Sequence, residues 1–328
     1  MRFAVQLPLD RVDLGEQFCS GQGIAECTRH VEDAGFDAVF VTDHPAPDDR
    51  WLARGGHHSF DPFVALSCAA CCTTTLKLFT NILVLPYRNP LIVAKSIASL
   101  DTVSAGRVIM GVGAGYLEGE FRACGVELQE RGQLMEEALQ AMKLAWSGNS
   151  FSFEGKHFYA GGNTALPRPV QAPHPPIWMG GNSAAAMRRA AQYCDGWLPF
   201  PVKGKFASHV RTRELADMQG LASAIADLRR LEQRFERDRA LDICMIPFGL
   251  DMHSGMDWNA GAILEQCEQL QALGVSWISI SLPCDDRSQY LEASSWFAQE
   301  VIAPMRSATR HARAESTPLA DPVSGSPG

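Results

Sequence analysis

The stretch from Val108 to Val126 reads VIMGVGAGYLEGEFRACGV, and it predicts a buried strand that runs into a glycine-rich bend. Gly111, Gly113 and Gly115 carry no side chain, so another body can approach the backbone closely there. The spacing G-x-G-x-G differs from the dinucleotide fingerprint G-x-G-x-x-G, and no helix opens directly after it, so the bend does not indicate a nicotinamide site. A tight strand exit without any ligand is the alternative interpretation of the bend.

On both sides of this bend, short β-rich runs alternate with longer helical patterns, which is typical of parallel βα units. The predicted strands are Arg2 to Leu7, Asp37 to Thr42, Lys77 to Leu85, Arg107 to Gly113, Pro176 to Gly180, Gly196 to Phe200, Asp242 to Gly249 and Trp277 to Leu282. The predicted helices are Ile24 to Ala34, Pro62 to Cys72, Pro90 to Ser104, Gly132 to Ser147, Ala184 to Tyr193, Leu215 to Asp238, Ala260 to Ala272 and Ser288 to Met305. Gly35, Gly106 and Gly274 are expected to end helices in the left-handed conformation.

Eight such units with continuous apolar strands predict the α/β class and a single TIM (β/α)8 barrel. One domain over residues 1–306 accounts for them. Residues 148–175 do not fit a simple unit, and they predict an insertion with a hairpin that turns at Glu154 and Gly155. The tail over residues 307–328 is poor in apolar residues, so we expect it to be disordered.

The composition is that of a globular protein: 46% of the 328 residues are hydrophobic and 20% are charged. The net charge of -8 argues against general binding to nucleic acid or to an anionic membrane. No signal sequence and no apolar run of membrane-spanning length is evident, which predicts a cytoplasmic protein.

Cys68, Cys71 and Cys72 form the densest cluster among ten cysteines. They lie in an Ala-rich segment that predicts a buried helix, and no second cysteine or histidine pair completes four metal ligands. We therefore expect them to pack as small hydrophobic residues and predict no metal site.

In a TIM barrel, function gathers at the carboxyl ends of the strands. Asp43 and His44 stand at such an end, where His44 could transfer a proton because its pKa lies near neutrality. Alternatively, Asp43 caps a loop and His44 packs as a neutral ring. His57 and His58 lie in the long loop from Pro45 to Phe60, as a solvated pair or as part of a lid.

The run Gly180, Gly181, Asn182, Ser183 ends a strand and begins a helix, so its backbone N–H groups suit a phosphate. The alternative is that Asn182 or Ser183 only caps the helix.

After the bend come Tyr116, which could line a pocket or donate a hydrogen bond, and Glu118 and Glu120. The two glutamates are expected to face solvent at the start of a helix that Phe121 anchors.

Taken together, the motifs resemble the bacterial luciferase-like superfamily and, within it, the coenzyme F420-dependent oxidoreductases. The motifs are VTDH (41–44), RNPLIVAK (88–95), GRVIMGVGAGYLEGEF (106–121), ERG (130–132), PRPVQ-x-P-x-PPIWMGG (167–181) and DGWLP (195–199). They occur in order and reach from Met1 to about Met305.

This resemblance implies a barrel whose mouth holds a flavin or deazaflavin, with its phosphate beside Gly180 and Gly181. It also implies a bulge behind the ring, often with a non-proline cis peptide, at Asn81 and Ile82. We expect these two residues to bind the cofactor together with Asp43, Val84, Gly113, Gly115 and Tyr116. His44 would act in proton transfer. The sugar-phosphate dehydrogenases of the superfamily carry a glutamate where this chain has Tyr116, which argues against sugar-phosphate chemistry.

The leading interpretation is therefore an F420-dependent oxidoreductase that acts on a small-molecule substrate. The alternatives are an FMN-dependent monooxygenase supplied by a partner reductase, and a flavin-binding protein without catalysis. A metal-dependent hydrolase would need more His and carboxylate ligands at strand ends than this chain offers. We expect the loops 45–60, 151–175 and 199–205 to select the substrate, and the resemblance favours a homodimer.

Overall fold

The computed structural model describes residues 1–249 and 258–307. All eight predicted strands are present, and they pair in parallel to close a barrel in the order β1-β10-β9-β8-β7-β4-β3-β2. The strands are β1 (Arg2–Gln6), β2 (Ala38–Val41), β3 (Lys77–Val84), β4 (Val108–Gly113), β7 (Ile177–Gly180), β8 (Gly196–Leu198), β9 (Asp242–Met245) and β10 (Trp277–Ile280). The predicted TIM barrel is confirmed.

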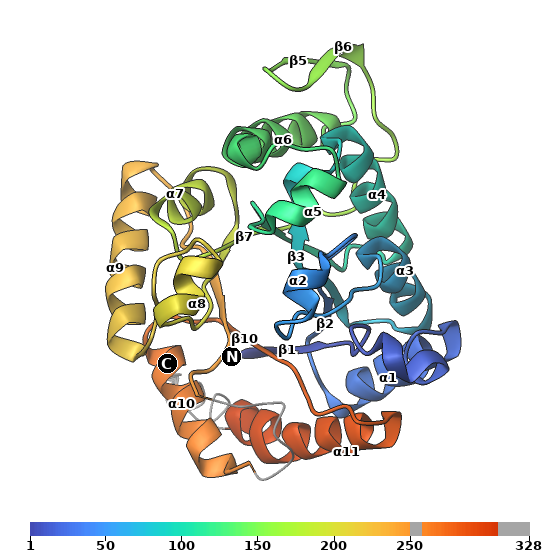
Figure 1. Ribbon diagram of the computed structural model, residues 1–328, viewed down its shortest axis with the longest axis vertical. Coiled ribbons are helices and arrows are strands. Elements are labelled where there is room, and N and C mark those ends of the chain that lie inside the picture. Colours follow the sequence, from blue (N-terminus) through green and yellow to red (C-terminus); the bar gives the residue numbers. More distant parts are fainter. Residues whose placement is uncertain (250–257, 308–328) are drawn as a thin grey trace, which may run out of the picture.

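The eight predicted helices form a ring around the barrel (Figure 1). They are α1 (Gly21–Ala34), α3 (Pro62–Cys72), α4 (Pro90–Val103), α6 (Arg131–Trp146), α7 (Ala184–Tyr193), α9 (Met218–Arg234), α10 (Ala260–Ala272) and α11 (Arg287–Phe297). Shorter elements sit between these units: α2 (Asp49–Leu52), α5 (Glu118–Ala123), α8 (Gly204–His209), and the 3-10 turns η1 (Val12–Gln17), η2 (Leu85–Tyr87) and η3 (Leu128–Glu130). The π-helical turn η4 (Ala298–Ile302) continues α11. In Figure 1, α2, α5 and α8 lie inside the ring.

Local sequence explains where many of the helices begin and end. The Asp61 side chain accepts hydrogen bonds from the N–H groups of Phe63 and Val64 at the start of α3, and such caps satisfy donors that the helix leaves unpaired. At the other end, Gly35, Gly106 and Gly274 have φ values of 98°, 82° and 93°, the left-handed conformation predicted for them.

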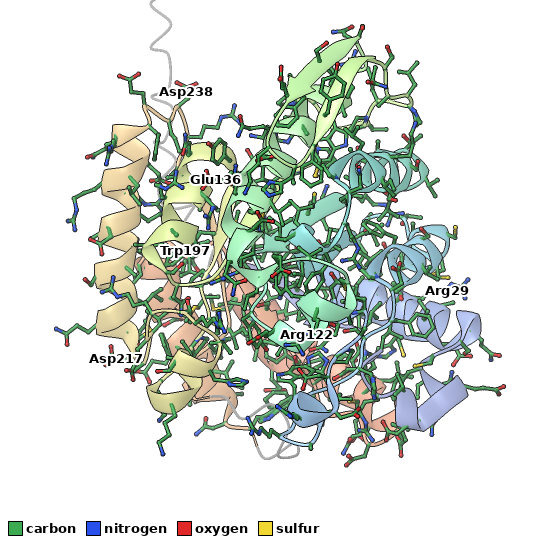
Figure 2. All side chains as sticks on the ribbon, turned by 45° about the horizontal axis from the view of Figure 1, so that its top comes forward. Arg29, Arg122, Glu136, Trp197, Asp217 and Asp238 are labelled. Atoms are coloured by element: carbon green, nitrogen blue, oxygen red, sulfur yellow. The ribbon has the colours of Figure 1, made fainter. Side chains whose placement is uncertain are left out.

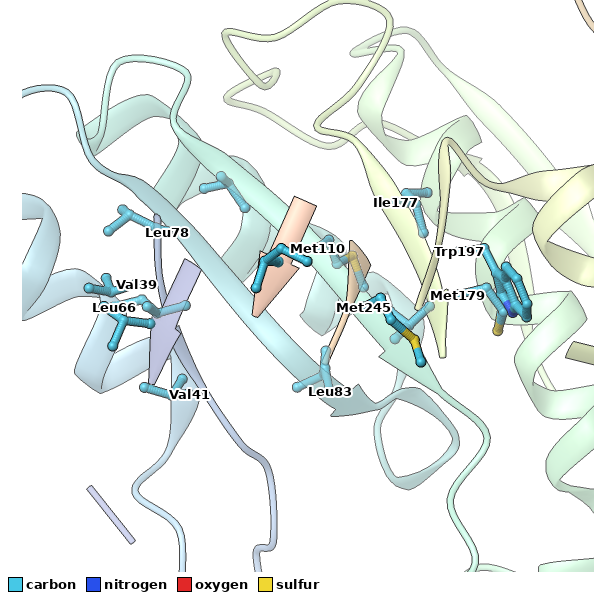
Figure 3. Close-up of a cluster of buried hydrophobic side chains, with 14 of the residues drawn as sticks. Val39, Val41, Leu66, Leu78, Leu83, Met110, Ile177, Met179, Trp197 and Met245 are labelled. Atoms are coloured by element: carbon cyan, nitrogen blue, oxygen red, sulfur yellow. The ribbon is translucent and has the colours of Figure 1, made fainter. Parts of the chain in front are cut away.

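Two apolar layers hold the barrel together. Alternate strand residues point outward to the helices, as Val39, Leu78 and Met110 do (Figure 3), whereas their neighbours fill the barrel. The interior is aromatic: the ring centroids of Phe79 and Trp178 lie 5.1 Å apart, and those of Trp178 and Trp277 lie 5.3 Å apart. The barrel is therefore a packed core with function confined to its ends. Charged side chains such as Arg29 and Asp238 are on the exterior (Figure 2).

The predicted hairpin is also present, as β5 (Phe151–Glu154) and β6 (Tyr159–Asn163), which pair antiparallel. It lies outside the ring beyond α6 (Figure 1), where Glu137 accepts a hydrogen bond of 2.9 Å from the His157 N–H. The disorder predicted for the tail concerns residues that, from 308 onward, lie outside the described residues.

The prediction for the cysteine cluster is wrong in part. Helix α3 buries Ala65, Leu66, Ala69 and Ala70, whereas Cys71 is exposed and its cysteine neighbours are only half-buried. The reason is helical period: Cys71 falls on the face turned away from the barrel. Over the described residues, no helix is long and apolar enough to cross a membrane.

Candidate functional site

A cavity of about 430 Å³ opens where β2, β3, β4 and β7 end. Every residue that the sequence predicts for the site lines it except Asn182: Asp43, His44, Asn81, Ile82, Val84, Gly113, Gly115, Tyr116, Gly180, Gly181 and Ser183. These side chains come together because the carboxyl ends of parallel strands meet at one rim of the barrel.

The glycines of the bend are close to another segment, but that segment belongs to the protein. A Cβ on Gly111 would lie 2.1 Å from the Thr80 carbonyl oxygen, and one on Gly113 would lie 1.9 Å from Ile82 Cδ1. The register of β3 against β4 shifts between Thr80 and Leu83, so β3 bulges toward β4 here. The glycines of β4 therefore leave room for the bulge of β3. Gly113 and Gly115 also line the cavity.

The bulge contains the cis peptide bond that the family resemblance implies, between Asn81 and Ile82. Both residues line the cavity, with Val84 beside them. Residues of the β3 bulge thus form one wall of the cavity, and Gly113 and Gly115 lie on the next.

Asp43 anchors this wall from β2. Its Oδ2 accepts hydrogen bonds from the Val84 N–H at 2.9 Å and from Arg88 Nη1 at 2.6 Å, and its Oδ1 accepts from Arg88 Nη2 at 2.8 Å. Burial raises the pKa of the Asp43 carboxyl, and the bonds from Arg88 and Val84 oppose that rise. Because both oxygens are occupied inside the protein, the carboxylate fixes the wall of the cavity.

His44 lies against aromatic rings from the loop 45–60. Its ring centroid is 4.5 Å from that of Trp51 on α2 and 4.9 Å from that of His57. His57 is half-buried, and desolvation lowers its pKa, so the expectation of a solvated histidine pair is wrong for His57. His58 is exposed, as expected. The loop therefore folds over His44.

Glu120 is buried, although the sequence predicted a solvated residue. Its Oε2 lies 3.2 Å from His44 Nδ1 and accepts a hydrogen bond of 3.0 Å from the Tyr87 hydroxyl, and its Oε1 accepts from the Ala46 N–H at 3.0 Å. Helix α5 turns Glu120 inward with Phe121, whereas Glu118 is exposed as predicted.

At the opposite side of the cavity, the β7–α7 junction exposes backbone. Gly181 has a φ of 111°, which favours glycine, and Ser183 caps α7 through the Ala186 N–H at 3.1 Å. Asn182 is turned away: its side chain bonds the backbone of Phe200 and Arg213. Asn182 therefore holds the following loop, and it does not line the cavity.

Three arginines that the sequence reasoning did not select stand at this end: Arg131 from α6, Arg189 from α7, and Arg211 after α8. Burial lowers the pKa of Arg131, and the charges of Arg211 and Arg189 lower it further. Among the described residues, no carboxylate lies within ion-pair distance of Arg131, whereas Glu136 accepts from Arg189 Nε at 2.9 Å. Arg131 lies in the ERG motif, but Arg189 and Arg211 are far from it in the sequence. The cluster could therefore not be predicted from the sequence.

Tyr116 separates the cavity from α8. It packs with Phe200, Val202 and Val210, and burial raises the pKa of its phenol, which therefore remains a neutral donor. The hairpin insertion lies elsewhere: within residues 1–249 and 258–307, nothing between 151 and 175 lines the cavity. That loop was expected to select the substrate, and its position beyond α6 argues against this.

The family profile described as luciferase-like monooxygenase matches residues 1–229, a segment that includes every element of the cavity. The chain belongs to this luciferase-like family. Relatives and structures of several kinds resemble it. The F420-dependent glucose-6-phosphate dehydrogenase of Intrasporangium calvum is 30% identical over 89% of this chain and 96% of its own.

Other members of the luciferase-like family carry another cofactor in their names. The FMNH(2)-dependent dimethylsulfone monooxygenase of Pseudomonas putida is 38% identical over 45% of this chain and 42% of its own. Among solved structures, the monooxygenase RslO1 of Streptomyces bottropensis superposes with a TM-score of 0.74 and 19% identity, over 93% of this chain and all of that one. That likeness supports the fold. The predicted family is confirmed, and its members are oxidoreductases and monooxygenases.

Proposed function

We propose that this protein is an F420-dependent oxidoreductase, which exchanges hydride between the deazaflavin and a small organic substrate while His44 moves the accompanying proton. The observation that carries the proposal is the composition of one cavity. The β3 bulge with the glycines of β4, an imidazole and a cluster of three arginines line the same cavity of about 430 Å³. A flat ring with a phosphorylated tail needs these three surfaces.

The residues fit such a cofactor on structural grounds. Asn81, Ile82 and Val84 of the bulge line one side of the cavity for the ring, and next to them Gly113 and Gly115 contribute no side chain. Arg131 is partly desolvated beside two other cations, so an anion placed among them would relieve their repulsion. The N–H groups at the start of α7 add donors for a phosphate.

When bound, the cofactor supplies or accepts the hydride. His44 would take the proton of a substrate hydroxyl during oxidation or return it during reduction, and Tyr116 offers a neutral hydroxyl in the same cavity. The loop 45–60 shields His44 from water because Trp51 and His57 cover its ring.

A second candidate is a monooxygenase that uses oxygen and reduced FMN delivered by a separate reductase. The local identity of 38% to an enzyme named for FMNH(2) favours it. Tyr116, which replaces the glutamate of the sugar-phosphate dehydrogenases, is compatible with either candidate.

Titration of the purified protein with F420 and with FMN, each in oxidised and reduced form, tests the proposal. We expect tighter binding of F420, and turnover with reduced F420 on a panel of ketones, aldehydes and enones. Tighter binding of reduced FMN with oxygen consumption would favour the monooxygenase. Binding of neither cofactor would refute both candidates.

A further inference from the structure

Glu120 is a buried carboxylate that takes no direct part in the proposed reaction. Its side chain is 0% exposed, and within residues 1–249 and 258–307 no lysine or arginine pairs with it. Burial of an unpaired charge is costly, so a protein rarely keeps one without hydrogen bonds or a function. Glu120 faces three groups from two segments of the chain, His44 and Ala46 on one and Tyr87 on the other, and the one that can become a cation is His44.

The donors around Glu120 fix which atom holds which proton. Burial, and then the charge of Glu120, raise the pKa of Tyr87 far above its usual range, so this phenol stays protonated and donates. The Ala46 N–H can only donate. The carboxylate therefore acts as an acceptor toward all its neighbours, and a neutral His44 must carry its proton on Nδ1 to bond it.

The other groups that face His44 do not compete with Glu120 as the anion that interacts with its ring. Arg88 neutralises Asp43 through two hydrogen bonds. His57 Nδ1 lies 2.8 Å from its own acceptor, the His58 carbonyl, and desolvation lowers the pKa of His57, which keeps its ring neutral near pH 7. Trp51 contributes an apolar face. In the described part of the chain, Glu120 is thus the one anion that remains to act on His44.

We propose that Glu120 is a positioning residue for His44: it holds the Nδ1 proton, leaves Nε2 free to exchange a proton with the substrate, and stabilises the imidazolium that results. The inference rests on the proposed function, because it assumes that His44 transfers a proton. The step would balance: the substrate O–H bond breaks as Nε2–H forms on His44, the C–H bond yields its hydride to a bound deazaflavin as C=O forms, and the Nδ1 proton remains on His44, hydrogen-bonded to Glu120. A carboxylate behind a histidine acts in this way in other enzymes.

The Glu120→Gln variant tests this role because it keeps the volume and inverts the hydrogen bonding. The Ala46 N–H still needs an acceptor, so the amide oxygen turns to it and the amide NH₂ faces His44 and Tyr87. His44 Nδ1 must then accept, and its proton moves to Nε2. We expect kcat to fall at least about tenfold, with unchanged cofactor affinity. The change of tautomer should appear in the ¹⁵N signals of the His44 ring.

Glu127→Gln is the matched control, since Glu127 is exposed, lies outside the cavity and has no side-chain ion pair within the described residues. It should keep kcat. A loss of similar size in Glu127→Gln, or full turnover in Glu120→Gln, would overturn the proposal.

A spectroscopic test needs no turnover and no variant at position 120. In ¹⁵N-histidine-labelled protein near pH 8, the signal that disappears in His44→Ala should show a protonated Nδ1 and an unprotonated Nε2. Protonated Nε2 in the wild type would overturn the positioning role, even if Glu120→Gln fails to fold. If the wild type shows the Nδ1 proton but His44→Ala keeps full turnover, the proton transfer of the proposed function is refuted instead.

Discussion

Arg88 donates two hydrogen bonds to the carboxylate of Asp43, with Nη1 2.6 Å from Oδ2 and Nη2 2.8 Å from Oδ1. Asp43 is almost fully buried, and it also accepts from the Val84 N–H. The pair therefore connects the end of β2 to the bulged end of β3, on the wall where the cavity requires a fixed backbone.

Replacing Arg88 with methionine should destabilise the protein by about 3–5 kcal/mol, because it leaves the Asp43 charge buried without its cation. Urea unfolding measures the loss. The control is Arg122→Met, which breaks an exposed pair with Glu118 on α5 and should leave the free energy of unfolding unchanged. Equal stability of Arg88→Met and wild type would mean that Asp43 is already protonated.

Gly111→Ala should disrupt the bulge. The new Cβ would meet the Thr80 carbonyl oxygen at 2.1 Å, and this backbone atom cannot rotate away as a side chain would. We expect a loss of about 1–3 kcal/mol in unfolding free energy. Gly21→Ala, where a Cβ meets nothing within 4 Å, should cause no loss. If both variants unfold alike, β3 can shift away from β4 without cost.

Arg131→Met should weaken cofactor binding about tenfold or more, because it removes a charge-assisted contact to the phosphate. Fluorescence titration with F420 and FMN at two salt concentrations measures this, and the variant should show the weaker salt dependence. Arg234→Met, at the exposed end of α9 and outside the cavity, is the control. The phosphate site is wrongly assigned if the two variants bind alike.

His44→Ala should retain its fold and its cofactor affinity while turnover falls at least about tenfold. Circular dichroism checks the fold, and steady-state rates on an identified substrate give the loss. An unaltered rate would return His44 to the role of a packed loop residue.

We expect His174 to account for part of the stability that the fold loses at acid pH. Desolvation lowers its pKa below the ordinary 6.5, so the unfolded chain binds a proton that the native state resists. The stability contributed by neutral His174 is therefore complete above about pH 6.5 and is lost as the pH falls toward the folded pKa. In His174→Asn, the decrease in Tm from pH 7 to pH 5 should be smaller than in wild type. An equal decrease would assign the sensitivity to other groups.

The sequence by itself determined the barrel and the rim at which the cavity lies. Strand and helix signals are local: an apolar run such as Val108–Val112 indicates a strand, and a glycine such as Gly35 marks a helix end within a few residues. Once eight units are recognised, parallel topology brings His44, Ile82, Gly113 and Gly181 to one end without further information.

Only the tertiary structure decided what surrounds these residues. Glu120 follows a bend in a polar run and looks solvated, yet its donors Ala46 and Tyr87 lie 74 and 33 residues away in the chain. Arg131, Arg189 and Arg211 meet from three separate elements. The burial of a side chain and its charged partners depend on how segments that are distant in the sequence pack together. Local periodicity carries no information on that packing, so these groups could be identified only from the tertiary structure.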